Sequence, residues 1–307
     1  MQEQTITALC AALTAQQLPF AQGEPLAPHT TFKIGGPAAF WCTPRDAEQL
    51  RRTLQLCREN GVRVYLLGNG SNTLFDDAGF DGAVIDMRGL SGMENSGLDT
   101  DAVRITAGAG QTLGRLCSKA QTLGLTGLEF ACGIPGTVGG AVYMNAGAYG
   151  GEMKDVLESV SYLTADGRWV DSEASELDLS YRHSAFEENG ACILGAVFRL
   201  AKGDPDAIKA RMNELMQKRI DKQPLDKPSA GSTFKRPAGA FAAALIDQCG
   251  LRGYRHGGAA VSDKHCGFVV NMGGATCADV LALCDEVRTI VKEKTGYDLE
   301  KEIRVVK

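Results

Sequence analysis

The sequence predicts an α+β fold built from more than one lobe. Three observations lead to this prediction: the chain has 307 residues, its helix-like and strand-like segments alternate irregularly, and no repeat of fixed period runs through it. A chain of this length exceeds one ordinary hydrophobic core. An irregular order of helices and strands favours α+β lobes over one regular parallel sheet. We place the main boundary near residue 200.

The first half of the chain is expected to alternate helices and short strands. Thr43 is the predicted N-cap of a helix that has Pro44 in its first turn and ends near Gly61. An apolar run over 62–67 predicts a strand that stops at a polar turn over 68–73. Further strands are predicted over 84–87 and 103–107, and a helix over 113–123.

The second half continues with a predicted hairpin. Its strands span 156–163 and 192–200, and Asp166-Gly167 is the turn signal that we expect to join them. A helix begins at Asp204-Pro205, and a loop with two prolines covers 221–230. The remaining expected elements are helices over 240–249 and 278–294, the latter opened by a Thr276/Asp279 capping box, and strands over 267–271 and 303–306.

The composition is that of a globular protein, with 44% hydrophobic and 22% charged residues and a net charge of −5. This balance lacks the basic excess of a nucleic-acid surface. No apolar run long enough to span a membrane is present, and the first residues lack the pattern of a signal peptide. We therefore expect a cytoplasmic protein that binds neither nucleic acid nor membrane.

The ten cysteines are scattered without a Cys-x-x-Cys pair. Cys57, Cys117 and Cys284 fall at core-facing positions of helix-like segments. We interpret the cysteines as buried reduced thiols rather than disulfides or metal ligands. The four histidines form no group with ligand spacing, so no metal site is predicted.

Two glycine-rich loops point to a ligand. Residues 133–150 hold six glycines, and residues 68–74 form a second turn of small and amide residues. Glycine loses backbone entropy without burying a side chain, so such a run serves close approach of the backbone to something else. Convergent backbone amides form anion sites, and the two loops could hold a dinucleotide pyrophosphate without a lysine. The alternative is that each is an ordinary tight turn.

A third glycine cluster, Gly108-x-Gly110, follows a strand and opens a helix, as in dinucleotide-binding Rossmann folds. Its next glycine, Gly114, comes four places after the second rather than three. We therefore interpret it as a strand-to-helix turn of another fold. A phosphate loop of the Walker type is also missing.

The order of the motifs resembles that of the UDP-N-acetylenolpyruvoylglucosamine reductase family. The matching segments are Thr31-Phe32-Lys33-Ile34-Gly35-Gly36, Gly68-Asn69-Gly70-Ser71-Asn72, Gly133-Ile134-Pro135-Gly136-Thr137-Val138-Gly139-Gly140, Asn145-Ala146-Gly147-Ala148-Tyr149-Gly150, Ser180-Tyr181-Arg182-His183-Ser184, Ala230-Gly231-Ser232-Thr233-Phe234-Lys235-Arg236-Pro237 and Leu299-Glu300-Lys301-Glu302-Ile303.

This resemblance implies a flavin-binding domain of the vanillyl-alcohol-oxidase type and a separate α+β substrate-binding domain. The flavin-binding domain would comprise two α+β subdomains, residues 1–80 and 81–200, and the substrate-binding domain would cover 201–307, with a last strand over 298–307. The implied reaction uses non-covalent FAD and NADPH to reduce an enolpyruvyl UDP-sugar to UDP-N-acetylmuramate for peptidoglycan synthesis. The chain looks short between Arg182 and Ser232, which suggests the subtype without a tyrosine-bearing insertion.

The resemblance also implies site residues. Arg182 and Glu302 would lie at the substrate carboxylate and Ser232 would donate a proton, and these three are the expected catalytic residues. The expected cofactor-binding residues are Lys33, Gly68, Asn69, Gly70, Ser71, Asn72, Gly133, Pro135, Gly136, Thr137, Gly139, Gly140, Asn145, Gly147 and Ala148. The expected substrate-binding residues are Tyr181, Lys222, Lys235 and Arg236.

Two other functions remain open at this point. One is a flavin oxidase of the same superfamily with covalently attached flavin, for which His29 is the nearest candidate. The other is a nucleotide-binding protein without catalytic activity. The joint presence of Arg182, Ser232 and Glu302 argues against the second.

Overall fold

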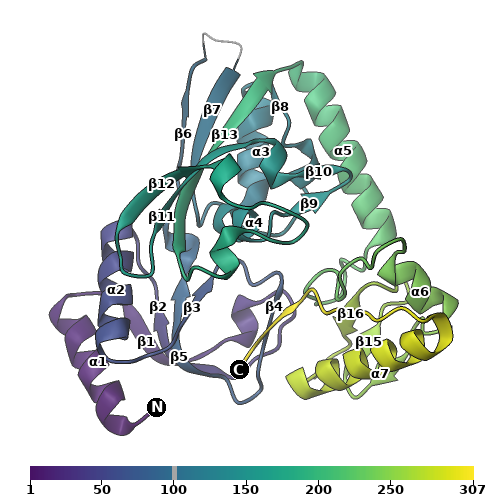
Figure 1. The fold of residues 1–307 in the computed structure, drawn as a ribbon, viewed down its shortest axis with the longest axis horizontal. Helices are drawn as coiled ribbons and strands as arrows, with labels where there is room; N and C mark the ends of the chain where they lie inside the picture. Colours follow the sequence, from purple (N-terminus) through teal and green to yellow (C-terminus); the bar gives the residue numbers. More distant parts are fainter. Residues whose placement is uncertain (99–101) are drawn as a thin grey trace. The chain divides into compact units, whose positions relative to one another are not determined.

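The computed structural model describes residues 1–98 and 102–307 and divides into two compact units. Unit 1 consists of Met1–Ala21, Trp41–Asn69 and Gly82–Arg219, and unit 2 of Gln22–Phe40, Gly70–Asp81 and Ile220–Lys307. Both units contain helices and strands (Figure 1), as the α+β prediction requires. Each unit is assembled from segments that are far apart in the sequence.

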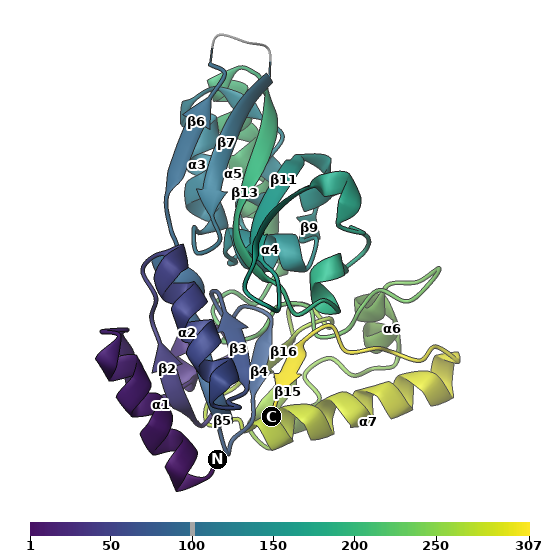
Figure 2. The same ribbon diagram turned by 60° about the vertical axis from the view of Figure 1, so that its left-hand side comes forward.

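Unit 1 is built on an antiparallel sheet with the strand order β12-β11-β13-β7-β6, and β8 also pairs with β13. Figure 2 shows this sheet from the side. On β7, Val103, Ile105 and Ala107 are buried at alternate positions, as expected for a strand with one covered face. The elements are β6 (Met93–Ser96), β7 (Ala102–Gly108), α3 (Leu113–Thr122), β8 (Leu125–Thr126), α4 (Val138–Tyr143), β11 (Leu157–Leu163), β12 (Trp169–Glu173) and β13 (Cys192–Lys202).

The predicted strands 156–163 and 192–200 do pair antiparallel, as β11 and β13, but the Asp166-Gly167 turn that was expected to join them does not. The turn at Gly167, whose N–H donates to Thr164 O at 2.8 Å, joins β11 to β12. Strand β11 then pairs with β12 on one side and with β13 on the other. The side chains of β12 alternate between exposed and half-buried, so this strand lacks the apolar run that would have revealed it.

A second, four-stranded sheet has the order β1-β2-β5-β3. Strands β3 and β5 are parallel, with Val64 opposite Ala83. The sequence did not predict α1, β1 or β2. The elements here are α1 (Glu3–Ala15), β1 (Phe20–Pro25), β2 (Pro37–Cys42), α2 (Ala47–Glu59), β3 (Val64–Leu67) and β5 (Phe80–Asp86).

Helix α2 begins three residues later than predicted. Its N-cap is Asp46, whose Oδ1 accepts from the Gln49 N–H at 2.8 Å, and not Thr43. A carboxylate satisfies a first-turn amide and also favours the positive end of the helix dipole. Gly61, with φ +64°, follows the end of the helix as predicted.

The larger hydrophobic core of unit 2 collects residues from distant segments. Phe32, Leu74, Phe234, Val287 and Ile303 all belong to it. Helix α7 is closed at its start by the predicted Thr276/Asp279 capping box and ends at Gly296, with φ +79°. The elements are β4 (Thr73–Phe75), α6 (Ala242–Gln248), β14 (Arg255–His256), β15 (Ala259–Val261), β16 (Val269–Asn271), α7 (Cys277–Thr295) and β17 (Arg304–Val306).

The remaining helical pieces connect these elements. Helix α5 (Pro205–Lys222) begins behind Asp204, as predicted, and Ile208 and Leu215 are buried on it. Short 3-10 helices occupy Ala27–His29, Met87–Gly89, Glu129–Ala131, Met153–Asp155, Ala174–Glu176 and Ala185–Glu187. Within the two described ranges, no helix is long and apolar enough to cross a membrane.

The cysteines are free thiols. Cys57, Cys117 and Cys284 are buried, and burial raises the pKa of Cys57 and of Cys284 to about 12. These three side chains are therefore neutral core residues. Eight of the ten cysteines are buried, as predicted, whereas Cys10 and Cys132 are half-buried.

We predict that Asp46→Ala destabilises the protein by about 1 kcal/mol, because the Gln49 N–H loses its only capping acceptor. Urea unfolding followed by circular dichroism measures this effect. Thr43→Ala is the matched control and should change stability by less than about 0.5 kcal/mol. If Thr43→Ala lowered the stability more than Asp46→Ala does, Thr43 would be the N-cap instead.

Candidate active site

The two glycine loops of unit 1 meet although 66 residues separate them. The Asn69 side-chain amide donates to Pro135 O at 2.6 Å. A Cβ on Gly68 would lie well inside contact distance of the Thr137 hydroxyl. Glycine at residue 68 therefore allows the end of β3 to pack directly against the second loop.

Thr137 and its neighbours are held by the turn between β7 and α3. The N–H groups of Val138 and Gly139 donate to Gln111 O and Ala109 O, both at 2.8 Å. A Cβ on Gly139 would lie 2.9 Å from Ala109 Cβ, so the close approach requires glycine there. The Gly108–Gly114 cluster is thus a strand-to-helix turn that supports the glycine run, as predicted.

Some backbone N–H groups of residues 136–140 are used in hydrogen bonds within the fold, and others are not. The amides of Val138 and Gly139 serve the fold, and the Gly140 N–H is 3.5 Å from the Thr137 hydroxyl. Among the described residues, no hydrogen bond uses the N–H groups of Gly136 and Thr137. These two amides are the donors that the run can offer to a ligand anion.

Asn145 is fully buried and fastens two parts of unit 1 together. Its Nδ2 donates to Glu152 Oε2 at 2.6 Å and to Ser180 O at 3.0 Å, and its Oδ1 accepts from the Lys154 N–H at 3.0 Å. The backbone at Asn145 has φ +39°, a conformation that asparagine tolerates better than most residues. Its side chain therefore holds these segments together, and the cofactor-binding role that the resemblance implies for Asn145 stays a prediction.

Arg182 lies against the second half of the glycine run. Its Nη2 donates to Gly147 O at 3.5 Å, and its guanidinium lies 5.1 Å from the centre of the exposed Tyr181 ring. Two backbone hydrogen bonds between Ser180 and His183 close the turn that carries Arg182, whose φ is +56°. Gly147 and Ala148 form β9 (Gly147–Ala148), which pairs with β10 (Gly151–Glu152).

His183 supports the same turn. Its Nδ1 is 3.2 Å from Glu187 Oε2 and its Nε2 is 3.1 Å from Asp178 Oδ2. Glu187 in the first place, and then Asp178, raise the pKa of His183. A raised pKa means that the protonated ring stabilises the folded turn at low pH and that this contribution is lost as the pH rises through the raised value.

In unit 2, the second part of the Gly68–Asn72 loop rests on two other segments. The Thr31 N–H donates to Gly70 O at 3.2 Å, and the Thr31 hydroxyl donates to Ser229 O at 2.6 Å. A Cβ on Gly70, whose φ is +59°, would overlap the His29 carbonyl. Ser71 follows, half-buried. Lys33 also has φ +59°, and its Nζ donates to Pro28 O at 3.0 Å.

Ser232 and Glu302 are brought onto neighbouring segments of unit 2. Exposed Ser232 precedes buried Thr233, whose carbonyl accepts from the Glu302 N–H at 2.8 Å. The Thr233 hydroxyl in turn accepts from the Val269 N–H at 2.8 Å. Asn72 Nδ2 donates to Glu302 O at 3.2 Å, so Asn72 orients the Glu302 backbone. The third expected catalytic residue, Arg182, belongs to unit 1.

The expected substrate-binding cations have local partners. Lys235 Nζ lies 2.6 Å from Glu300 Oε1, and the Arg236 guanidinium lies 4.6 Å from the centre of the Phe241 ring. Lys222 is the exposed last residue of α5. His29, the candidate for a covalent flavin link, has its Nε2 2.7 Å from Glu24 Oε1.

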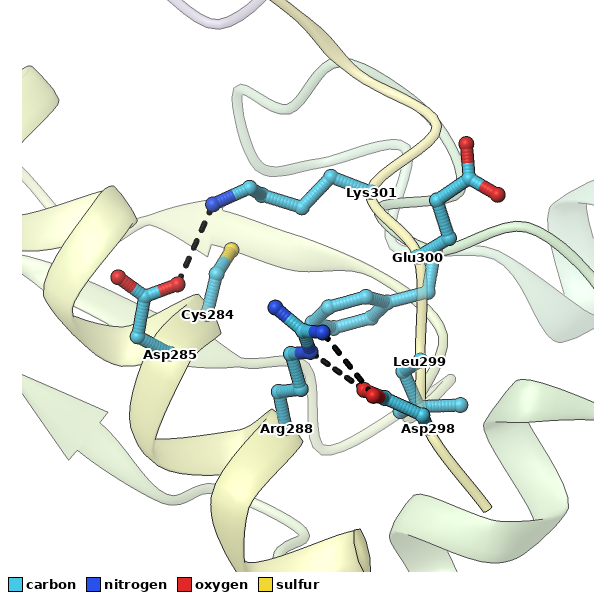
Figure 3. Close-up of a pocket in the computed structure, with 8 residues that line it drawn as sticks. Cys284, Asp285, Arg288, Asp298, Leu299, Glu300 and Lys301 are labelled. Carbon is cyan, nitrogen blue, oxygen red and sulfur yellow. Dashed lines mark hydrogen bonds and ion pairs between the residues drawn. The ribbon is translucent and has the colours of Figure 1, made fainter.

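A cavity of about 430 Å³ in unit 2 lies between α7 and residues 298–301. Figure 3 shows that its charged groups face one another: Arg288 contacts the Asp298 carboxylate, and the Lys301 ammonium reaches Asp285 at 3.2 Å. Ser232 and Glu302 do not line it. Because these pairs satisfy each other's charges, we infer no ligand here.

Sequence reasoning missed the residues that hold the site together. The Thr137 hydroxyl packs against Gly68 and caps α4, while the cofactor contact expected of Thr137 stays a prediction. Thr233 was not predicted at all. The capping role of Thr137 had a signal in the sequence, a threonine just before a helix, whereas the contacts of Thr233 join residues too far apart to leave one.

Comparisons with known proteins agree with these features. The family model "FAD binding domain" matches residues 38–173, and the model "UDP-N-acetylenolpyruvoylglucosamine reductase, C-terminal domain" matches residues 223–306. A protein of Agathobacter rectalis named UDP-N-acetylenolpyruvoylglucosamine reductase is 50% identical over 302 residues, which cover 94% of this chain and 95% of that protein.

Two solved structures show the same fold. The crystal structure of UDP-N-acetylenolpyruvylglucosamine reductase from Thermus caldophilus is 35% identical, covers 94% of this chain and 99% of that one, and has a TM-score of 0.78. A variant of berberine bridge enzyme is 16% identical, covers 64% of this chain and 44% of that one, and has a TM-score of 0.50, a likeness in fold alone. The FAD-binding part therefore has the vanillyl-alcohol-oxidase type of fold, as the sequence resemblance implies.

We predict that Gly139→Ala destabilises the protein by about 1–3 kcal/mol and lowers the FAD retained per chain, because the new methyl group overlaps Ala109. Thermal unfolding and flavin absorbance after gel filtration measure both effects. Gly114→Ala is the control, since no atom lies within 4 Å of the place that its new methyl group would take and a helical glycine is replaced. It should stabilise by roughly 0.5–1 kcal/mol with full FAD content; equal behaviour of the two variants would contradict the packing argument.

Proposed function

This chain belongs to the UDP-N-acetylenolpyruvoylglucosamine reductase family, and on that basis we propose that it reduces UDP-N-acetylglucosamine enolpyruvate to UDP-N-acetylmuramate. It is an FAD-dependent oxidoreductase that uses NADPH, and its product is a precursor of peptidoglycan. The nearly full-length match to curated relatives of that name carries this proposal. Since both substrates are nucleotides, we place the enzyme in the cytoplasm, where it serves cell-wall growth and thereby cell shape, division and the cell cycle.

The residues of unit 1 fit a flavin nucleotide. The Gly136 and Thr137 amides have no internal acceptor among the described residues, and the adjoining turn at Gly68 and Asn69 brings a second stretch of bare backbone beside them. Such backbone donors suit a diphosphate. When bound, FAD carries the hydride from NADPH to the enolpyruvyl group. We assign 1–80 and 81–200 to the two FAD-binding subdomains and 201–307 to substrate binding.

Arg182 is proposed to bind the carboxylate of the enolpyruvyl group. Negative charge grows toward this carboxylate as hydride reaches the neighbouring double bond. A guanidinium at that point interacts more strongly with the developing charge than with the ground state, and this difference lowers the barrier. The contacts of Arg182 with Gly147 and Tyr181 keep the guanidinium in a defined place before substrate arrives.

Ser232 is proposed as the proton donor and Glu302 as the second group at the substrate carboxylate. The hydrogen bonds of Thr233 and Asn72 to the Glu302 backbone hold both residues in a fixed relation within unit 2. Such pre-organisation lowers the entropy cost of the proton transfer. Tyr181, Lys222, Lys235 and Arg236 are proposed to contact the UDP part of the substrate, with the cations near its diphosphate.

Anaerobic flavin spectroscopy tests the function. Adding NADPH to the yellow protein should bleach the flavin band at about 450 nm, and adding the enolpyruvyl UDP-sugar should restore it. Failure of the sugar to restore the band, with recovery only on admitting oxygen, would favour a flavin oxidase. Flavin that stays on the denatured chain in mass spectrometry would point the same way.

We predict that Ser232→Ala leaves flavin reduction by NADPH nearly intact and slows reoxidation by the UDP-sugar about 10²-fold or more, because only the second half-reaction needs the proton. Stopped-flow absorbance measures each half-reaction. The control is Ser229→Ala in the same loop, where the backbone N–H and carbonyl, and not the side chain, bond to Thr31; both rates should stay unchanged. Equal slowing of both half-reactions by Ser232→Ala would refute its role as proton donor.

A further inference from the structure

Arg219 is a cation that the fold places on the glycine run of unit 1. It lies in the last turn of α5. A Cβ on Gly133 would be 2.9 Å from Arg219 Cδ and 3.7 Å from Arg219 Nε. The stem of the arginine therefore lies directly on the Gly133 backbone, and glycine at this position leaves room for it.

The sequence of α5 directs this side chain inward. Met212, Met216 and Arg219 are spaced by four and three residues, so they share one helix face. This face covers the start of the glycine run: the Cys132 thiol lies 3.6 Å from Met212 O, and Met216 Cε would be 3.6 Å from a Cβ on Gly133. Arg219 is therefore part of the wall behind the run.

Glu214, one of the three acids on α5, pairs with other cations. Arg211 and Lys218 each lie 2.6 Å from a Glu214 oxygen, and all three side chains are about half exposed. In the part of the chain that the structure describes, no ion pair or hydrogen bond involves Arg219. Its electrostatic neighbours are Tyr149 and Cys132, a phenol and a thiol rather than carboxylates.

Burial without an acid is costly for a guanidinium. Desolvation lowers the pKa of Arg219, and the nearby Tyr149 and Cys132 only partly oppose this. A cation withdrawn from water is stabilised by an anion, and here no protein carboxylate supplies one. Arginine is also the residue that most often binds anionic oxygens of ligands in such places. We therefore look for the anion that pairs with Arg219 in the bound ligand.

The residues around Arg219 indicate that this ligand is FAD. Gly133 opens the loop that supplies the Gly136 and Thr137 amides, and Tyr149 directly follows β9, whose Gly147 carbonyl accepts from Arg182. Residues 133–149 lie within the region that matches the FAD-binding family model, and Arg219 lies beyond its end. FAD carries negative charge at its diphosphate, and its ring system gains negative charge on reduction.

We propose that Arg219 is the cation that pairs with a negatively charged group of bound FAD, reached across the Gly133 backbone on the wall formed by α5. This inference rests on the proposed function, because it requires FAD in unit 1. It assigns a flavin-binding role to a residue outside the glycine-rich motifs.

Three variants test it: Arg219→Gln removes the charge, Arg219→Lys keeps the charge without the planar fork, and Arg211→Gln removes an arginine from the exposed face of the same helix. Titration of each apoprotein with FAD should give a Kd about 10- to 100-fold higher for Arg219→Gln. Arg219→Lys should fall between, and Arg211→Gln should match the wild type.

Thermal unfolding with and without FAD separates binding from folding. The Arg219→Gln apoprotein should be at least as stable as the wild type, because a desolvated unpaired charge is gone. Its stabilisation by a fixed FAD concentration should be smaller. If this apoprotein does not fold, Arg219→Met, which also removes the charge, decides: wild-type affinity and potential in that variant would overturn the proposal.

The midpoint potential distinguishes the two anionic parts of FAD. If Arg219 pairs with the diphosphate, Arg219→Gln weakens the binding of oxidised and reduced FAD equally and leaves the potential unchanged. If Arg219 pairs with the ring, Arg219→Gln weakens the binding of the reduced form more, and a tenfold difference lowers the potential by about 30 mV.

Wild-type FAD affinity and potential in Arg219→Gln would overturn the proposal. If that variant also had a raised KM for NADPH or the UDP-sugar, the cation would be assigned to that substrate instead. A wild-type protein that fails to bind FAD would instead refute the proposed function.

Discussion

The packing of Thr137 between two loops is the constraint on which the site in unit 1 depends. Its hydroxyl occupies the space beside Gly68, accepts from Gly140, and stands at the start of α4, while the amides of Val138 and Gly139 are fixed by the β7–α3 turn. A side chain at residue 68 or 139 would push these segments apart. The glycines serve first to bring the loops together, and the bare amides of Gly136 and Thr137 are a consequence of that closeness.

In unit 2, side chains rather than glycines hold the segments of the site together. Thr233 and Asn72 bond to the two backbone groups of Glu302, and β17 then pairs in parallel with β4. Ser232 stays exposed because its neighbour Thr233 carries the structural contacts. A flexible serine would lose the advantage of being held near its substrate, so the anchoring of Thr233 matters for the proposed proton transfer.

Backbone strain gathers in the same segments. Among the described residues, Lys33, Asn145, Tyr149 and Arg182 have φ between +39° and +59° without being glycine. Each such conformation costs about 1–3 kcal/mol and persists only where surrounding contacts hold it. For Asn145 these contacts are three hydrogen bonds of its own side chain, and for Arg182 they are the closed Ser180–His183 turn.

The sequence by itself determined the α+β class, the capped helix α7, the buried thiols and the family, because these depend on local propensity, on periodicity or on the order of motifs. It misplaced the start of α2, since two plausible caps lie three residues apart, and it missed β12, whose polar pattern resembles a loop. Only the tertiary structure showed that the side chains of Asn145 and Thr137 hold neighbouring segments together. It also showed that the N–H groups of Val138 and Gly139 are already bonded within the fold, and that the Arg219 side chain lies on the Gly133 backbone. Those facts depend on contacts between segments tens of residues apart, and a linear pattern of residue types does not record which polar atom meets which.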